Sequence, residues 1–248
     1  MSAGIVVDGL EFAYPDGRRA LTGVDLAVDA GERVAVLGSN GAGKTTLALH
    51  LNGIYQPSKG SVVIGDLPVI EANLTEIRRR VGLVFQDSND QLFMPKVGED
   101  VAFGPANLGV SGSELDRRVD AALQAVGGGD LADRPAHHLS GGERRRAALA
   151  TVLAMEPDVL VFDEPSSDLD GAGRRELVAA LLPVDLTQLV ITHDLPLALE
   201  LCPRAVIMRE GRVVADGATR ALLADAALLA ENRLELPYGF RLDLPHPG

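Results

Sequence analysis

The segment GSNGAGKT, residues 38–45, constrains the fold of this chain more than any other part of its sequence. The branched apolar run RVAVL (33–37) precedes it, and the helix-forming run TTLALHL (45–51) follows it. A buried strand, a glycine-rich turn and a helix in this order begin a unit that joins parallel strands through helices. The alternative, a glycine-rich turn with an incidental lysine, would leave both flanking elements unexplained.

This segment fits the pattern G-x-x-x-x-G-K-[ST] of a phosphate-binding loop. The glycines let backbone N–H groups surround phosphates, and the helix N-terminus adds its positive dipole end. We expect Lys44 to reach the β- and γ-phosphates of ATP and Thr45 to bind Mg²⁺. The predicted ATP contacts in this loop are Gly38, Ser39, Asn40, Gly41, Ala42, Gly43, Lys44, Thr45 and Thr46.

Strand and helix patterns alternate along the chain. Further strand-like runs occur at 81–85 (VGLVF), 158–165 (DVLVFDEP) and 188–194 (QLVITHD), and the pattern between residues 87 and 142 is helical. This order predicts an α/β fold whose core sheet is mostly parallel and covered on both faces. The short β-like runs before residue 33 predict a small additional sheet at the N-terminus.

Composition limits the class of partner. The chain has 248 residues, a formal charge of −12 and 35 acidic against 23 basic residues, which argues against a nucleic-acid partner. A single cysteine excludes an intrachain disulfide and fits a reducing, cytoplasmic compartment. We find no signal-peptide pattern and no apolar run of bilayer-spanning length, so at a membrane another chain would have to hold this one.

Two consecutive carboxylates, Asp163 and Glu164, end the strand-like run VLVFDE. Beside a phosphate loop, Asp163 is placed to hold Mg²⁺ and Glu164 to polarise an attacking water. His193 ends the run LVITH and should reach the same edge of the sheet, where open α/β sheets bind ligands. Taken alone, the acidic pair could be an exposed strand end and the histidine a structural residue. The phosphate loop upstream favours the site.

The run LSGGERRRAALATVLAMEPDVLVFDEPSSDLD (139–170) joins several motifs. Ser140 and Glu143 match a capping box, which predicts a helix start; a glycine-rich helix N-terminus with a serine hydroxyl is also a good phosphate site. Here the chain resembles the ATP-binding cassette (ABC) family over nearly its whole length. In that family LSGG is the signature motif, which contacts ATP held by the phosphate loop of a second cassette. The resemblance therefore implies a dimer with a second copy of this chain or with a paralogous ATPase.

The resemblance also implies roles for single residues. Glu164 resembles the general base, His193 the switch histidine, and Gln86 the glutamine that senses Mg²⁺ and the γ-phosphate. Tyr14, in FAYPDG, resembles the aromatic that stacks on adenine, although a tyrosine near the N-terminus can also be a core or surface residue. The implied catalytic residues are Glu164, His193 and Lys44, the further ATP contacts are Tyr14, Gln86, Ser140, Gly141, Gly142 and Asp170, and the Mg²⁺ ligands are Thr45, Gln86 and Asp163.

The fold implied by the resemblance is a P-loop cassette in a single domain, residues 1–248. Its core and an antiparallel β subdomain would take about residues 1–86 and 151–217, and an inserted helical subdomain about 87–150. A C-terminal helical extension would take about 218–248. Two departures from the family pattern add negative charge near a polyphosphate: Glu143 in place of the usual glutamine, and Asp168 where a small residue is more usual.

Three functions compete for such a cassette: the ATPase subunit of a membrane importer, a soluble cassette acting on nucleic acid or ribosomes, and a metabolic P-loop kinase. The second class usually has paired cassettes, coiled coils or basic arms, which this acidic chain lacks; a kinase would not need LSGG. The run VFQDSNDQLFMPKVGEDVAFGPANLGV (84–110) closely resembles energy-coupling-factor (ECF) importers, in particular the cobalt and nickel type. Vitamin importers of the same class, or another ABC importer, remain alternatives.

This resemblance implies a place on the cytoplasmic face of the cell membrane. The partners would be a transmembrane coupling subunit and a substrate-binding membrane subunit. We expect the transported metal to bind those partners, because His137 and His138 should point different ways and no other cluster has ligand spacing. The tail LLADAALLAENRLELP resembles the C-terminal helix of the same importers, although its first half could equally be an ordinary packing helix.

Overall fold

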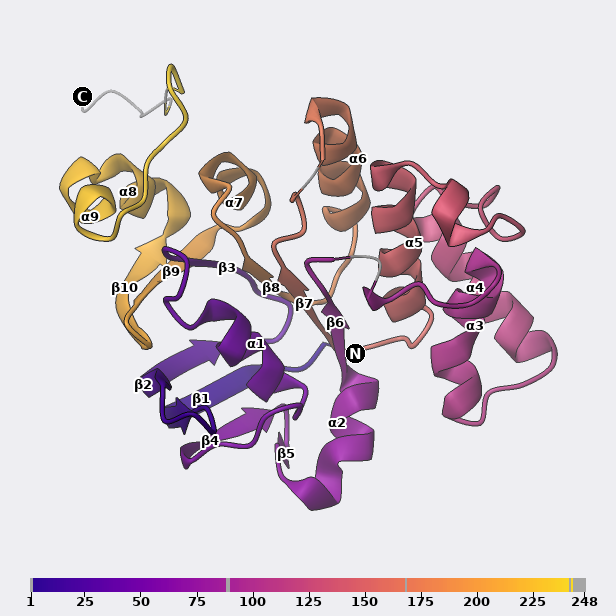
Figure 1. Cartoon of the computed structure of the whole chain (residues 1–248), viewed down its shortest axis with the longest axis horizontal. Coiled ribbons are helices and arrows are strands. Elements are labelled where there is room, and N and C mark those ends of the chain that lie inside the picture. Colours follow the sequence, from indigo (N-terminus) through magenta and orange to yellow (C-terminus); the bar gives the residue numbers. More distant parts are fainter. Residues whose placement is uncertain (1, 88–89, 168, 241, 243–248) are drawn as a thin grey trace.

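A six-stranded sheet and a four-stranded sheet organise the chain, as Figure 1 shows. The computed structural model describes residues 2–87, 90–167, 169–240 and 242. The smaller sheet is antiparallel, with the strand order β2 (Arg19–Val28), β1 (Ile5–Ala13), β4 (Lys59–Ile64), β5 (Leu67–Pro68). The larger sheet has the order β10 (Arg212–Ala218), β9 (Arg204–Arg209), β3 (Arg33–Leu37), β8 (Thr187–Ile191), β7 (Val159–Asp163), β6 (Val81–Val84). Only β10 is antiparallel to its neighbour.

The described residues form helices between and after these strands. They are α1 (Lys44–Leu51), α2 (Leu74–Arg80), α3 (Val97–Asn107), α4 (Ser113–Ala125), α5 (Gly141–Leu153), α6 (Gly171–Leu181), α7 (Leu195–Leu201), α8 (Thr219–Ala224) and α9 (Ala226–Glu231). None of these is long and apolar enough to cross a membrane. Helices α3, α4 and α5 follow one another with no strand between them.

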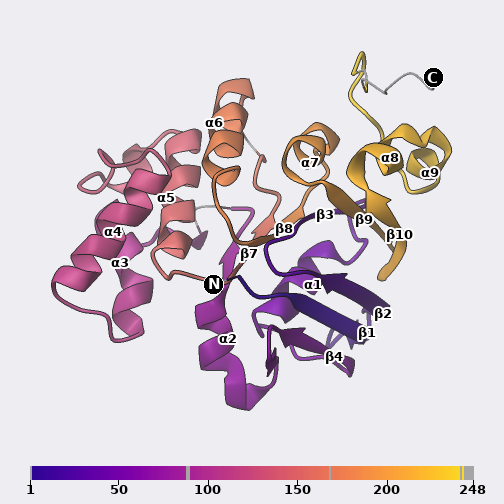
Figure 2. The same ribbon diagram turned by 180° about the vertical axis from the view of Figure 1, so that it is seen from behind.

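The central strands of the larger sheet are buried on both faces, and most of their residues are apolar. In β3, Val34 and Val36 pack toward α1 and the antiparallel sheet, whereas Ala35 and Leu37 pack toward the helices on the other face. In β7, Val161 and Phe162 divide in the same way. This two-residue alternation places α1 between the two sheets, as both ribbon views show (Figures 1 and 2).

The helices α3, α4 and α5 pack against one another at one end of the molecule, beside β6 and β7 (Figure 2). Helices α8 and α9 lie at the opposite end. Helix α5 extends from this lobe to Leu153, where its C-terminal part contacts β6. The boundary expected near residue 150 therefore falls inside a continuous helix.

The mostly parallel core sheet, the antiparallel N-terminal sheet and the helical insertion all match the expected fold class. Strand ends differ by a few residues: β6 ends at Val84, one residue early, β7 ends at Asp163, before Glu164, and β8 ends at Ile191, before His193. The helix-like tail forms two short helices, because Asp225 ends α8 and its carboxylate caps α9 by accepting from Leu228 N–H at 2.9 Å.

Candidate active site

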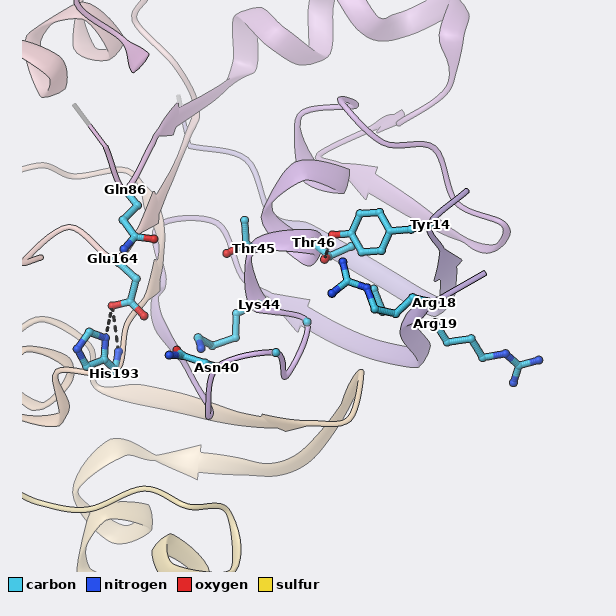
Figure 3. A pocket seen from close by; sticks show the side chains of 13 residues that line it. Tyr14, Arg18, Arg19, Asn40, Lys44, Thr45, Thr46, Gln86, Glu164 and His193 are labelled. Carbon is cyan, nitrogen blue, oxygen red and sulfur yellow. Dashed lines mark hydrogen bonds and ion pairs between the residues drawn. The ribbon is translucent and has the colours of Figure 1, made fainter. Parts of the chain in front are cut away.

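A cleft of about 450 Å³ opens where β3, β7 and β8 end and α1 begins (Figure 3). It is lined by Tyr14, Arg18, Arg19, Ala20, Asn40, Gly41, Gly43, Lys44, Thr45, Thr46, Gln86, Glu164 and His193. These residues are widely separated in sequence, and parallel pairing of the strands brings them to one sheet edge. Most of the predicted phosphate loop and four predicted residues from other segments therefore share one cleft.

Glycines shape the loop before α1. Gly38 has a φ of +152°, and a Cβ there would lie 2.4 Å from the carbonyl oxygen of Met208. Gly43, with a φ of +104°, is the N-cap of α1, and its Cβ would lie 2.7 Å from the carbonyl oxygen of Ala20. No other residue fits such close backbone approaches without a shift of the chain. The loop can therefore turn tightly and present its N–H groups toward the cleft.

Lys44 is held at the base of this loop. Its ammonium donates to the carbonyl oxygens of Gly38 at 2.8 Å and Ser39 at 3.2 Å, and the residue is 7% exposed. Burial lowers the pKa of Lys44, while the charges of Glu164 and Asp163 oppose that shift. These two hydrogen bonds hold the lysine side chain in place beside two carboxylates.

Asp163, the last residue of β7, has a buried carboxylate oxygen without a partner. Its Oδ1 makes no hydrogen bond within the described part of the chain, and the residue is 6% exposed. Burial raises the pKa of Asp163, and a hydrogen bond with Thr45 and the charge of Lys44 oppose that shift. An orphaned carboxylate oxygen next to a threonine hydroxyl is the donor set that a hard cation such as Mg²⁺ prefers. The two residues present fit that ion.

Glu164 follows directly and adopts a left-handed backbone conformation, with a φ of +50°. Its Oε2 accepts from the His193 backbone N–H at 3.2 Å and lies 2.8 Å from His193 Nδ1 (Figure 3). For this bond to form with an ionised carboxylate, Nδ1 must carry the proton. Glu164 Oε1 makes no hydrogen bond to any described residue, so it is available to a molecule in the cleft.

Gln86 lies two residues after β6, and its side chain points into the cleft next to Glu164 (Figure 3). The backbone around it is fixed by two side chains whose contacts here the sequence did not predict. Arg145 donates to the carbonyl oxygens of Phe85 and Gln86, both at 2.9 Å, and Gln91 Oε1 accepts from Phe85 N–H at 3.0 Å. Their partners lie far away in the sequence or across a loop, so no local pattern could reveal them.

Comparison with known proteins identifies the arrangement. The sequence profile described as ABC transporter matches residues 21–167, more than half of the chain. The chain belongs to the ABC transporter family. It is an ATP-binding and ATP-hydrolysing cassette, and its fold class is that of the P-loop ABC ATPases.

Relatives similar to this cassette are named as ATP-binding proteins of transporters, some of them with a transporter class or a substrate. A Streptomyces coelicolor protein, provisionally named as an ABC transporter ATP-binding protein, is 63% identical over 96% of this chain and 92% of its own. The ECF transporter ATP-binding protein EcfA of Carboxydothermus hydrogenoformans is 48% identical (96% and 88%). The cobalt import ATP-binding protein CbiO of Rhodobacter capsulatus is 47% identical (96% and 86%).

Solved structures agree. The cbiO1 protein of Clostridium perfringens, described as part of the ABC transporter complex cbiONQ, superposes with a TM-score of 0.83 and 36% identity over 96% of this chain and 97% of its own. A dimeric cassette in a post-hydrolysis state, bound to ADP and Pi, superposes with a TM-score of 0.77 and 27% identity, covering 87% of this chain and 98% of its own.

In this ABC ATPase, Tyr14 lies at the outer end of the cleft. Its hydroxyl is 2.8 Å from Thr46 Oγ1, and Phe12 packs edge-on against it at 5.3 Å. The Arg18 guanidinium lies over the ring, 4.6 Å from its centre. A base that stacks on this face must displace Arg18 or lie against its outer side. Arg19, the other arginine of this edge, points away from the cleft (Figure 3).

The signature segment of this cassette lines a different cleft, of about 440 Å³. Ser140 is the N-cap of α5 and forms the expected capping box with Glu143. Asp170 also lines this second cleft, but its carboxylate caps α6 by accepting from the N–H groups of Ala172 and Gly173. Ser140, Gly141, Gly142 and Asp170 are therefore close to one another and do not line the cleft of Lys44.

The departure at Glu143 is compensated within the chain. Its Oε1 accepts from Arg134 Nη1 at 2.6 Å, and its Oε2 accepts from the Ser140 backbone N–H at 2.8 Å. The Ser140 and Arg134 hydrogen bonds lower the pKa of Glu143 to about 2. Arg134, outside every motif, thus neutralises the extra charge. The other departure, Asp168, lies outside the described residues, as do Ser88 and Asn89.

The expectation for the histidine pair was wrong in its geometry. His137 and His138 lie in a 3₁₀ turn with ring centroids 4.2 Å apart, because the tighter turn brings adjacent side chains closer than an extended backbone would. Within the described residues, no group of three or more His, Cys, Asp or Glu side chains could hold a metal ion.

Proposed function

We propose that this ABC ATPase is the energising subunit of an ECF-type importer that moves a transition metal ion, cobalt or nickel, across the cell membrane. Relatives named EcfA and CbiO, which match this chain along nearly its whole length, support this proposal. So does the superposition with a subunit of a cbiONQ complex. The placement would be the cytoplasmic face of the membrane.

The observation that carries the chemistry is the cluster of Lys44, Asp163, Glu164 and His193 at the edge of one cleft. We propose that water attacks the γ-phosphorus of ATP while Glu164 Oε1 accepts the water proton, so that the β–γ bridging bond breaks and ADP leaves. His193 fixes Oε2 and keeps the carboxylate oriented toward the cleft. Lys44 stabilises negative charge on the β- and γ-phosphates.

Mg²⁺ would be held by Thr45, Asp163 and Gln86, where it would neutralise charge on the β- and γ-phosphates. The other ATP contacts that we propose are the loop residues 38–46 and, for adenine, Tyr14. Arg18 over the Tyr14 ring would have to move or take part in that stack.

A second cassette would complete the site. Within one chain, Lys44 and Ser140 line separate clefts, so a single copy cannot place both on one nucleotide in this conformation. We propose an opposed pair, formed with a second copy or a paralogous ATPase, in which Ser140, Gly141, Gly142 and Asp170 face ATP bound by the partner. A related cassette that forms a dimer after hydrolysis supports this arrangement.

Two exposed aromatic rings lie together on the helical lobe. Phe93 is 61% exposed and Phe103 42%, and their rings meet edge to face at 5.0 Å. Phe93 lies two residues beyond Gln91, in the segment that follows Gln86. We propose that this pair docks a helix of a transmembrane coupling subunit, so that movement of the lobe on ATP binding reaches the membrane; a substrate-binding membrane subunit would complete the importer.

The proposal is tested by coexpressing the chain with the membrane proteins that copurify with it and measuring ATP-dependent uptake. We expect labelled cobalt or nickel to enter, and uptake to stop when Lys44 is replaced by alanine. Uptake of a labelled vitamin and of no metal would contradict the proposed substrate but would still support the importer function. Recovery of ribosomes or nucleic acid, with no polytopic membrane protein, would contradict the transport function.

A further inference from the structure

Arg145 lies on α5, five residues after the signature serine, and its side chain leaves its own helix for two other segments. It is 4% exposed. Nη1 donates to the Phe85 carbonyl oxygen at 2.9 Å, and Nη2 donates to the carbonyl oxygens of Gln86 at 2.9 Å and Ser167 at 3.3 Å. We call α5 the signature helix, because the signature motif lies at its N-terminus. One guanidinium therefore joins the signature helix, the segment that carries Gln86 and the segment that follows Glu164.

Only an arginine can make this set of contacts. Its planar guanidinium presents donors in a fixed fork, which matches carbonyl oxygens that lie in two directions. A lysine ammonium is a compact point charge with no fork. Burying a cation costs free energy unless its donors are hydrogen-bonded. The three carbonyl oxygens accept from the Arg145 guanidinium and so reduce the cost of burying it.

The same backbone is fastened to α5 a second time. Gln91 Oε1 accepts from Phe85 N–H at 3.0 Å, and its Nε2 donates to the Ala148 carbonyl oxygen and to Thr151 Oγ1, both at 3.3 Å. Both polar groups of the Phe85 backbone are thus tied to the signature helix, directly or through one side chain. The residue that follows, Gln86, has its carbonyl oxygen held and its exposed side chain directed into the cleft.

We infer that Arg145 is a positioning residue that holds Gln86 and the segment after Glu164 in a fixed position relative to the signature helix. The catalytic cleft of one cassette and the N-terminus of its signature helix, which we call the signature end, therefore move together. The inference rests on the proposed function, because it requires that Gln86 act at the phosphates. It adds a residue of this chain, acting through Gln86, to those that touch the nucleotide.

A double-mutant cycle tests this role in the purified full-length chain. Arg145→Lys should lower kcat for ATP hydrolysis by at least about fivefold and leave KM within about twofold, because the P-loop still binds the nucleotide. Gln86→Ala should lower kcat by about tenfold. If Arg145 acts through Gln86, the double variant should match Gln86→Ala within about twofold.

The matched control is Arg118→Lys. Arg118 lies on α4, its side chain is 19% exposed, and it pairs with Glu114 and Glu156 at 2.9 and 3.0 Å, outside both clefts. Its replacement should change neither kcat nor the effect of Gln86→Ala. Melting curves for all variants set an assay temperature at which each is folded.

If the fold losses in kcat of the two single variants multiply in the double variant, the inference is overturned. Such a result would mean that Arg145 affects kcat independently of Gln86. A wild-type kcat for both Arg145→Lys and Arg145→Gln would also overturn it, as would loss of cooperative melting in both, which would make Arg145 a requirement of the whole fold. ATP hydrolysis by the unaltered chain, and its loss in Glu164→Gln, test the proposed function separately.

Discussion

Glu164 contacts His193 through only one of its two carboxylate oxygens. One oxygen can therefore orient the side chain while the other accepts a proton. Oε2 is occupied by the His193 ring and backbone, which leaves Oε1 for a proton from water. A general base needs both a fixed orientation and a free oxygen within reach of its substrate. The left-handed backbone of Glu164 places the carboxylate beyond the end of β7, where it meets the cleft.

Glu143 and Arg134 offer a test of how the signature serine is maintained. Arg134→Met would leave the Glu143 charge without its ion pair beside the second cleft. We expect kcat/KM for ATP hydrolysis to fall by about fivefold, because an unpaired carboxylate repels a polyphosphate. Adding Glu143→Gln should restore it, since a glutamine oxygen still accepts from the Ser140 N–H without carrying charge.

Glu143→Gln alone is the control for that pair and should stay within about twofold of the unaltered chain. No recovery in the double variant would show that Arg134 acts by supporting the chain around His138, to whose carbonyl oxygen it also donates at 3.2 Å, and not by neutralising Glu143.

At the scale of elements, the run FQDSNDQLF (85–93) has parts with different surroundings. Phe85 and Gln86 follow the end of the core strand β6. Gln91 joins the returning chain to α5, and Asp100 of α3 accepts from the N–H groups of Phe93 and Met94, both at 2.9 Å. Backbone groups that have no strand or helix partner are thus paired with side chains. The aromatic ring of Phe93 is left on the surface.

That exposed ring leads to a prediction about docking. Replacing Phe93 and Phe103 together by serine should reduce the membrane protein that copurifies with the chain by at least about tenfold, because aromatic anchors dominate such interfaces. Val214→Ser, on β10 and 41% exposed, removes an exposed apolar side chain elsewhere and should leave recovery unchanged. Undiminished recovery with the two serines would place the membrane partner on another surface.

The sequence predicts the elements well where a pattern is local. The strand and glycine-rich turn around Gly38 and Lys44, and the capping box at Ser140, are contiguous signals, and the structure contains both elements. The contacts of Arg18, Arg134 and Arg145 were not predicted, because an arginine in a polar or helical run gives no sign of its partner. Arg145 and Phe85 are 60 residues apart in sequence and come together only when α5 packs beside β6.

At the scale of the whole molecule, the phosphate loop and the signature motif line separate clefts. We therefore expect one chain alone to be an incomplete enzyme. The lobe of α3, α4 and α5 carries the signature end and the exposed aromatic pair, while the core carries the phosphate loop and the acidic strand end. Closing two copies on ATP would bring each signature end to the other's cleft and move the two lobes.

The most direct test of this account is the Glu164→Gln variant, assayed for both nucleotide binding and hydrolysis. The substitution keeps the size of the side chain and removes the base, so ATP affinity should stay within about threefold while turnover falls by about 1000-fold or more. Turnover near that of the unaltered chain would contradict the assignment of Glu164, and with it the mechanism proposed for this cleft.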